Sequence, residues 1–149
     1  MKYKRLSIQE LASLEKTFVR FLATQSITGD DWTKIKNNDH DHMNELLDQF
    51  SDLITEQTLN NIEYLIFFSN KQLFLFQAEK EFIHLKVVKH DLNIDKNTAI
   101  DHFFEQLKNE GKVQTKQTKD YQPDRNTELF KMIESGARIV DGELYQAFQ

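Results

Sequence analysis

The chain has 149 residues, with 24 acidic and 19 basic side chains and a formal net charge of −5. It contains no cysteine, which excludes disulfides, cysteine-ligated zinc, iron–sulfur clusters and thiol catalysis. The acidic balance argues against a nucleic-acid-binding domain, because such domains gain affinity from clustered Lys and Arg. The length fits one ordinary domain spanning residues 1–149.

The sequence gives no sign of a membrane segment. No stretch approaches the roughly 18 apolar residues of a membrane span. The opening "MKYKRLSIQELASLEK" has basic residues but no apolar run behind them, so it does not have the pattern of a signal peptide. We therefore expect a soluble cytoplasmic protein without membrane contact.

The N-terminal part of the chain carries helical periodicity. Ser7 and Glu10 have the spacing of a capping box, and apolar residues then recur every three or four positions. The pattern predicts helices at about residues 8–24, 30–36 and 40–58. Asp39 or Asn38 is the expected N-cap of the third helix.

The apolar period then changes from helical to two. Alternating residues predict three strands, at about residues 62–68, 73–77 and 82–88. The connections between them are short, so neighbouring strands must run antiparallel. The predicted fold is therefore α+β, with a three-stranded antiparallel meander packed with N-terminal and C-terminal helices.

Both faces of this meander are rich in apolar residues. We place the turns at Asn70-Lys71 and Glu79-Lys80, which sets Phe76 opposite Ile83. One face is then entirely apolar and is the predicted core face: Leu65, Phe67, Phe74, Phe76, Ile83, Leu85 and Val87. The second face is apolar at the first hairpin and mixed at the third strand: Ile62, Tyr64, Ile66, Phe68, Leu73, Leu75, Gln77, Phe82, His84, Lys86 and Val88.

Two interpretations of the second face are open. The first, which we favour, is that a later helix or the C-terminal piece covers it, since single-domain chains normally bury such a face internally. The second is that it is a docking surface for another protein or a second copy of the chain, with His84 and Lys86 as its polar rim. The candidate partner-binding residues are Tyr64, Phe68, Leu73, Leu75, Phe82, His84 and Lys86.

The C-terminal third is less regular. The sequence predicts a helix at about 99–110, a loop at 112–125 and a helix at about 127–135. The pattern of residues 137–149 fits two structures. Asp141 and Gly142 can form a tight hairpin turn, or Asp141 can cap a final short helix.

Two segments suggest chemistry without establishing it. Asp39, His40 and His42 resemble part of a metal site, and a small metal-dependent hydrolase is one alternative function. However, the two histidines are two positions apart and point to different sides of a helix, whereas acidic residues at a helix start commonly cap it. We therefore predict no metal, cofactor or catalytic residue. The segment Lys108–Arg125 leans basic, which makes a ribonucleoprotein-associated factor the other alternative.

Three short motifs carry a resemblance: "MKYKRL" at the start, "FSDL" at Phe50–Leu53 and "DGELY" at Asp141–Tyr145. With the length, they resemble an uncharacterised family of roughly 150-residue proteins, common in Bacteroidota and classed as a domain of unknown function. The resemblance spans the chain and brings no catalytic residues. It implies a bacterial, cytoplasmic protein.

The favoured function is a non-enzymatic protein-binding or adaptor module, with a protein partner or a second copy of itself as its ligand. This hypothesis depends on the two-faced hairpin, the lack of a catalytic motif and the acidic charge.

Overall fold

The computed structural model describes residues 1–94, 97 and 100–149. The chain divides into two compact units, Met1–Thr58 and Leu59–Gln149, each with a hydrophobic cluster of its own. The single domain expected from the length stays a prediction. Within the described residues, no helix is long and apolar enough to cross a membrane.

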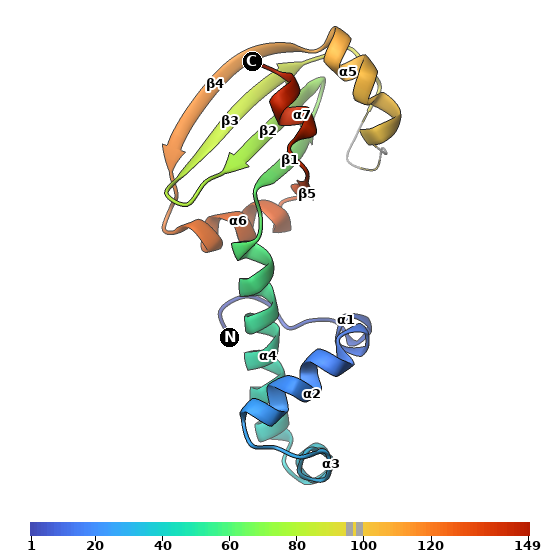
Figure 1. Ribbon diagram of the computed structural model, residues 1–149, viewed down its shortest axis with the longest axis vertical. Coiled ribbons are helices and arrows are strands. Elements are labelled where there is room, and N and C mark those ends of the chain that lie inside the picture. The colour runs from blue at the N-terminus through green and yellow to red at the C-terminus, as the bar shows by residue number, and fades with distance from the viewer. Residues whose placement is uncertain (95–96, 98–99) are drawn as a thin grey trace. The chain divides into compact units, whose positions relative to one another are not determined.

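The first unit is helical (Figure 1). Its helices are α1 (Ile8–Ser13), α2 (Glu15–Thr24), α3 (Gly29–Asn38) and α4 (His40–Asn60), whose last two residues belong to the second unit. The first predicted helix is thus two helices, separated at Leu14, where the backbone leaves helical geometry (φ −107°, ψ 19°). The side chain of Leu14 packs against the aromatic core of the unit.

Side chains cap three of these helices. Ser7 Oγ accepts the backbone N–H of Glu10 at 3.1 Å while the Glu10 carboxylate accepts that of Ser7, as the sequence predicts. Thr28 and Asp31 form the same box at α3. These backbone hydrogen bonds lower the pKa of Glu10 and of Asp31. The helices therefore begin where the sequence supplies partners for free amides.

The core of the first unit is aromatic. The Phe18 ring packs edge-on against Trp32 and Phe50, with centroids 5.0 and 4.9 Å away. Such pairs add to the free energy gained from burial alone. The buried members are Phe18, Phe21, Leu22, Leu46 and Phe50.

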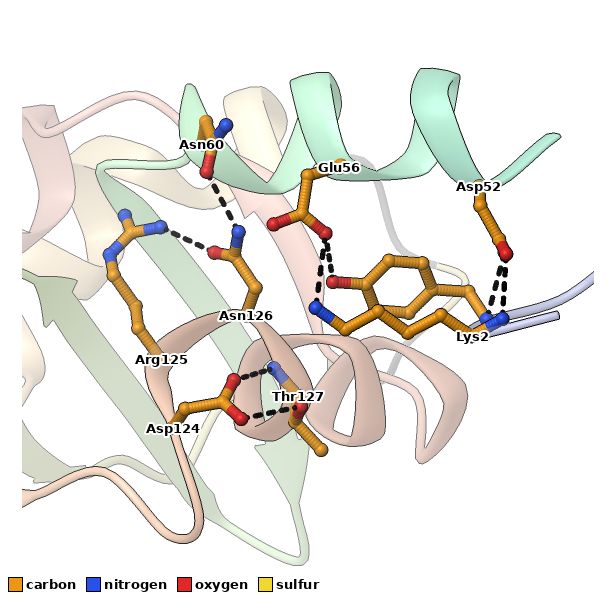
Figure 2. A network of polar contacts seen from close by, with 9 residues as sticks. Lys2, Asp52, Glu56, Asn60, Asp124, Arg125, Asn126 and Thr127 are labelled. Carbon is orange, nitrogen blue, oxygen red and sulfur yellow. Dashed lines mark hydrogen bonds and ion pairs between the residues drawn. The ribbon is translucent and has the colours of Figure 1, made fainter. Parts of the chain in front are cut away.

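An N-terminal arm lies along α4 and is held by that helix. Asp52 accepts the backbone N–H groups of Lys2 and Tyr3 at 2.6 and 2.9 Å (Figure 2). Ser51 Oγ accepts the backbone N–H of Leu6 at 3.1 Å. Glu56 accepts the hydroxyl of Tyr3. The "MKYKRL" and "FSDL" motifs are thus hydrogen-bonded to each other, and these bonds attach the N-terminal arm to α4.

The second unit is built on a five-stranded antiparallel sheet in the order β4-β3-β2-β1-β5 (Figure 1). The strands are β1 (Tyr64–Ser69), β2 (Gln72–Ala78), β3 (Phe82–Lys89), β4 (Lys112–Asp120) and β5 (Arg138–Val140). The helices are the 3-10 helix η1 (Ile100–Phe103), α5 (Phe104–Glu110), α6 (Arg125–Glu134) and α7 (Glu143–Ala147). The α+β class holds, but the predicted three-stranded meander was wrong because two edge strands join it.

The strand β4 occupies most of the segment predicted as a loop at 112–125. Its sequence, KVQTKQTKD, has almost no apolar residue, so it lacks the alternation that marks a half-buried strand. It pairs with β3 at one edge of the sheet, and eight of its nine residues are exposed. Lysines on an edge strand also discourage pairing with other chains.

The first hairpin has the predicted register, with Phe67 opposite Phe74. The second is shifted by two residues, so that Phe76 lies opposite Leu85 and not Ile83. A shift of two keeps every side chain on its predicted face, because side chains alternate with a period of two. The predicted faces are therefore correct although the second turn is longer than expected.

The second face, named the covered face after its buried residues Ile66, Leu73, Leu75 and Val88, is the better buried of the two. These four are at most 1% exposed and pack with Leu107 of α5, Leu144 of α7 and Phe148. Figure 1 shows α7 crossing in front of the sheet. The favoured interpretation, that later segments of the chain cover this face, is confirmed.

The predicted core face is only partly buried. Leu65, Ile83 and Val87 are buried, whereas four of its members are partly exposed: Phe67, Phe74, Phe76 and Leu85. We call these four the half-open face. Ile139 of β5 lies opposite Leu65 and is 50% exposed.

Arg125 joins elements of the second unit through backbone carbonyls. Its guanidinium donates to the carbonyls of Leu59, Ile62 and Glu79 at 2.8, 2.6 and 3.1 Å. Its neighbour Asn126 donates to Asn60 at 2.7 Å (Figure 2). Arg125 therefore satisfies carbonyls at the end of α4, before β1 and in the β2–β3 turn.

Candidate functional site

Beyond the apolar cluster, the covered face continues as a polar surface on β1, β3 and β4, beside α7. We name this surface the polar strip and define it by Tyr64, His84, Lys86, Lys116, Thr118 and Tyr145. All of these except Tyr64 line a cavity of about 260 Å³. The strip brings together titratable groups from segments 81 residues apart in the chain, Tyr64 and Tyr145.

Lys86 is held in place from three directions. Its ammonium donates to the carbonyl of Tyr145 at 3.0 Å and to that of Phe148, and it lies 3.9 Å from the centroid of the Tyr145 ring. Carbonyl dipoles and the ring face both attract a cation. Burial, and secondarily the charge of Lys116, lower the pKa of Lys86.

Lys116 lies directly opposite Lys86 in the β3–β4 ladder. Like charges in this position destabilise a sheet. Within the part of the chain that the structure describes, neither ammonium has a carboxylate partner, although Lys108 and Lys119 each have one. The pair is thus a positive site beside a cavity, without a carboxylate counterion among the described residues.

His84 connects a hydroxyl and a carboxylate. Its Nδ1 is 2.7 Å from Thr118 Oγ, and its Nε2 is 2.9 Å from Glu79 Oε2. An ionised carboxylate only accepts hydrogen bonds, so Nε2 carries a proton. In the neutral ring, Nδ1 therefore accepts the hydroxyl proton of Thr118. Both ring nitrogens are engaged, which fixes the orientation of the ring.

Two tyrosines form the α7 side of the strip. The rings of Tyr64 and Tyr145 have centroids 5.6 Å apart, and Gln146 donates to the Tyr64 hydroxyl at 3.2 Å. Burial, and then the neighbouring Tyr64 and Glu79, raise the pKa of Tyr145. Gly142 permits this packing, since a Cβ there would come within 2.6 Å of the Tyr64 ring.

The comparison with protein families matches residues 1–149 to a family of unknown function, DUF6495. The chain belongs to the DUF6495 family. No curated protein and no solved structure matches it. The expected membership of an uncharacterised family is thus confirmed, and the expectations of a bacterial source and a cytoplasmic location stay predictions.

In this DUF6495 chain, the seven candidate partner-binding residues lie in three different places. Tyr64, His84 and Lys86 lie in the polar strip, whereas Phe82 lies at the start of β3 and is 43% exposed. The remaining three contribute to the apolar cluster that α5 and α7 cover: Phe68, Leu73 and Leu75. Partner binding by any of the seven stays a prediction.

Sequence reasoning missed three residues of the strip. Lys116 and Thr118 belong to β4, whose polar sequence indicated a loop, and Tyr145 belongs to the C-terminal piece whose structure was left open. One signal for Tyr145 was available, because the "DGELY" motif contains both it and Gly142. In the structure, Tyr145 of this motif lines the cavity of the strip, and Gly142 lies against the Tyr64 ring.

Two other segments were singled out from the sequence, at Asp39–His42 and at Lys108–Arg125, and residues of both have structural roles. Asp39 Oδ1 accepts the backbone N–H of His42 at 3.1 Å, as expected of the cap of α4. No group of three or more His, Cys, Asp or Glu could hold a metal ion among the residues that the structure places. In the basic segment, Lys119 pairs with Glu128, and Arg125 binds backbone carbonyls.

Proposed function

We propose that this DUF6495 protein is a non-enzymatic protein-binding module that recognises an anionic group of its partner at the polar strip. The observation that carries the proposal is the pair Lys86 and Lys116, which lie opposite each other without a carboxylate partner in the described residues. A bound anion would remove the repulsion between them.

The surroundings of Lys86 support this role. Its ammonium is positioned by two carbonyls and an aromatic ring, so little conformational entropy is lost when it binds an anion. The cavity of about 260 Å³ is below the usual range of small-molecule pockets, roughly 300–1,000 Å³. This size favours a single side chain of a partner over a cofactor.

The alternatives have less support. A hydrolase at Asp39, His40 and His42 would need Asp39, whose carboxylate caps α4. A ribonucleoprotein-associated role needs several free cations along Lys108–Arg125, and three of them are engaged: Lys108, Lys119 and Arg125. Two free lysines are few for binding driven by phosphate neutralisation.

Capture of partners from the native host tests the proposal. The bait is the full chain as wild type, as Lys116→Glu, or as Lys112→Glu, a charge reversal at another exposed lysine of β4. We expect quantitative mass spectrometry to show proteins lost with Lys116→Glu and retained with Lys112→Glu. Recovery of the same proteins by all three baits would refute the proposal.

A further inference from the structure

We infer that the anionic group is a phosphate monoester, carried on a phosphorylated Ser or Thr side chain of the partner protein. The inference rests on the proposed function and specifies the chemistry of the same site. It starts from the number of uncompensated charges, which is larger than one carboxylate can neutralise.

The charge of the strip matches a dianion. Lys86 and Lys116 contribute two positive charges, and neither has a carboxylate partner within the described residues. Glu79 lies beside the strip, but its carboxylate binds His84. A phosphate monoester carries a charge of about −1.5 to −2 at neutral pH, whereas an Asp or Glu side chain carries −1. Of these two single groups, the phosphate brings the lysine pair closer to neutrality.

The donors of the strip also suit a group with three terminal oxygens. Lys86 uses two of its three N–H bonds on carbonyls and lies over the Tyr145 ring, so it contributes to ligand binding mainly through its charge. Lys116 is exposed and keeps three N–H bonds. Tyr145, whose side chain carries a hydroxyl, lines the same cavity. Cations and hydroxyls together form the charge-assisted hydrogen bonds that bind phosphate.

The surroundings of the polar strip disfavour ligands that carry several phosphates close together, such as a nucleic-acid backbone or a membrane surface. Glu79 binds to the strip's histidine, and Asp120 follows Thr118 on the same face of β4. These carboxylates and the net charge of −5 would repel every phosphate, and the single lysine pair can offset that repulsion for one phosphate but not for a second and third. For an isolated phosphate on a protein side chain, Lys86 and Lys116 offset this repulsion.

Direct titration of the isotope-labelled full chain tests the inference. The probes are N-acetyl-O-phosphoserine and N-acetyl-aspartate, followed by chemical-shift changes in nuclear magnetic resonance spectra. We expect the phosphorylated probe to bind at least about fivefold more tightly, since one additional charge-assisted hydrogen bond is worth that much. The shifts should centre on the amides of Lys86, Lys116 and Thr118.

Matched variants locate the site. Lys116→Gln should weaken the phosphorylated probe at least about fivefold, and Lys112→Gln should leave its affinity within about twofold. Both lysines are exposed on β4, so both variants should stay folded, which a thermal melt verifies. An equal effect of the two variants would overturn the site, because binding would then follow overall charge alone.

The outcomes separate this inference from the proposed function. Equal affinity for the two probes would overturn the phosphate preference and leave an acidic partner possible in the capture experiment. Absence of phosphoserine binding would also overturn it. Loss of captured partners after phosphatase treatment of the host lysate would agree with the inference, and their retention would contradict it.

Discussion

The two faces of the sheet carry similar apolar residues but bury them to different extents. On the covered face, Ile66, Leu73 and Leu75 are at most 1% exposed. On the half-open face, Phe67, Phe74 and Phe76 keep part of their larger surfaces accessible. The difference shows that hydrophobicity alone does not decide which side becomes the core. The covered face becomes the core because α5 and α7 pack on it.

The largest expected effect comes from a charge on the covered face. Leu75→Asp would bury an unpaired carboxylate at a position that is 1% exposed. Such a charge costs several kcal/mol, comparable to the whole stability of an ordinary domain. We expect the sheet amides to lose their protection in hydrogen exchange, whereas Gln117→Asp on exposed β4 should keep it.

A Leu75→Asp variant with a native melt and protected sheet amides would break the comparison. It would mean that α7 moves away from the sheet at little cost and that the covered face is accessible. Light scattering on the same sample would then report whether a second copy takes the place of α7.

A smaller loss of stability is expected when Leu73 or Phe74, neighbours on opposite faces of the sheet, is replaced by alanine. Leu73 is fully buried, so Leu73→Ala should cost about 2–5 kcal/mol. Phe74 is only half-buried, so Phe74→Ala should cost less than the roughly 3–5 kcal/mol of a core phenylalanine. Denaturant unfolding of both variants measures the difference.

The order of these two values matters more than their size. Although phenylalanine is the larger residue, we expect Leu73→Ala to destabilise more. The reverse order would show that the half-open face is buried in solution, by a partner or by a second copy, and that the difference between the faces is smaller than in the structure.

The sequence predicted what depends on local pattern. The capping box of Ser7 and Glu10, the helix periods and the alternation of β1 to β3 act over a few residues, and each appeared near its predicted position. The strand β4 could not be predicted in this way, because its pairing energy comes from backbone hydrogen bonds to β3 and not from apolar side chains. β5 has three residues, too few for a recognisable alternation.

The candidate site was predicted only in the part that lies on β1 and β3. His84 and Lys86 alternate with apolar residues, which identifies them as the polar members of one face. Their partners Lys116 and Tyr145 lie 30 and 59 residues further along the chain, as the numbering shows. Contacts at such separations depend on the complete topology, which no local pattern contains.

The smallest expected effect tests how completely water is excluded beside the covered face. His90 follows β3 and is 3% exposed, its Nδ1 accepts the backbone N–H of Leu92 at 3.1 Å, and burial lowers the pKa of this imidazole. The folded protein therefore holds His90 neutral, whereas the unfolded chain protonates it near pH 6.5. Stability should fall as the pH drops below about 6.5 and level off below the folded pKa, with a slope of at most about 1.4 kcal/mol per pH unit.

Denaturant unfolding between pH 7.5 and pH 5 should show this slope in the wild type and a reduced slope in His90→Asn, whose Oδ1 can still accept the Leu92 N–H. An equal slope in the two proteins would mean that water reaches the imidazole in the folded state.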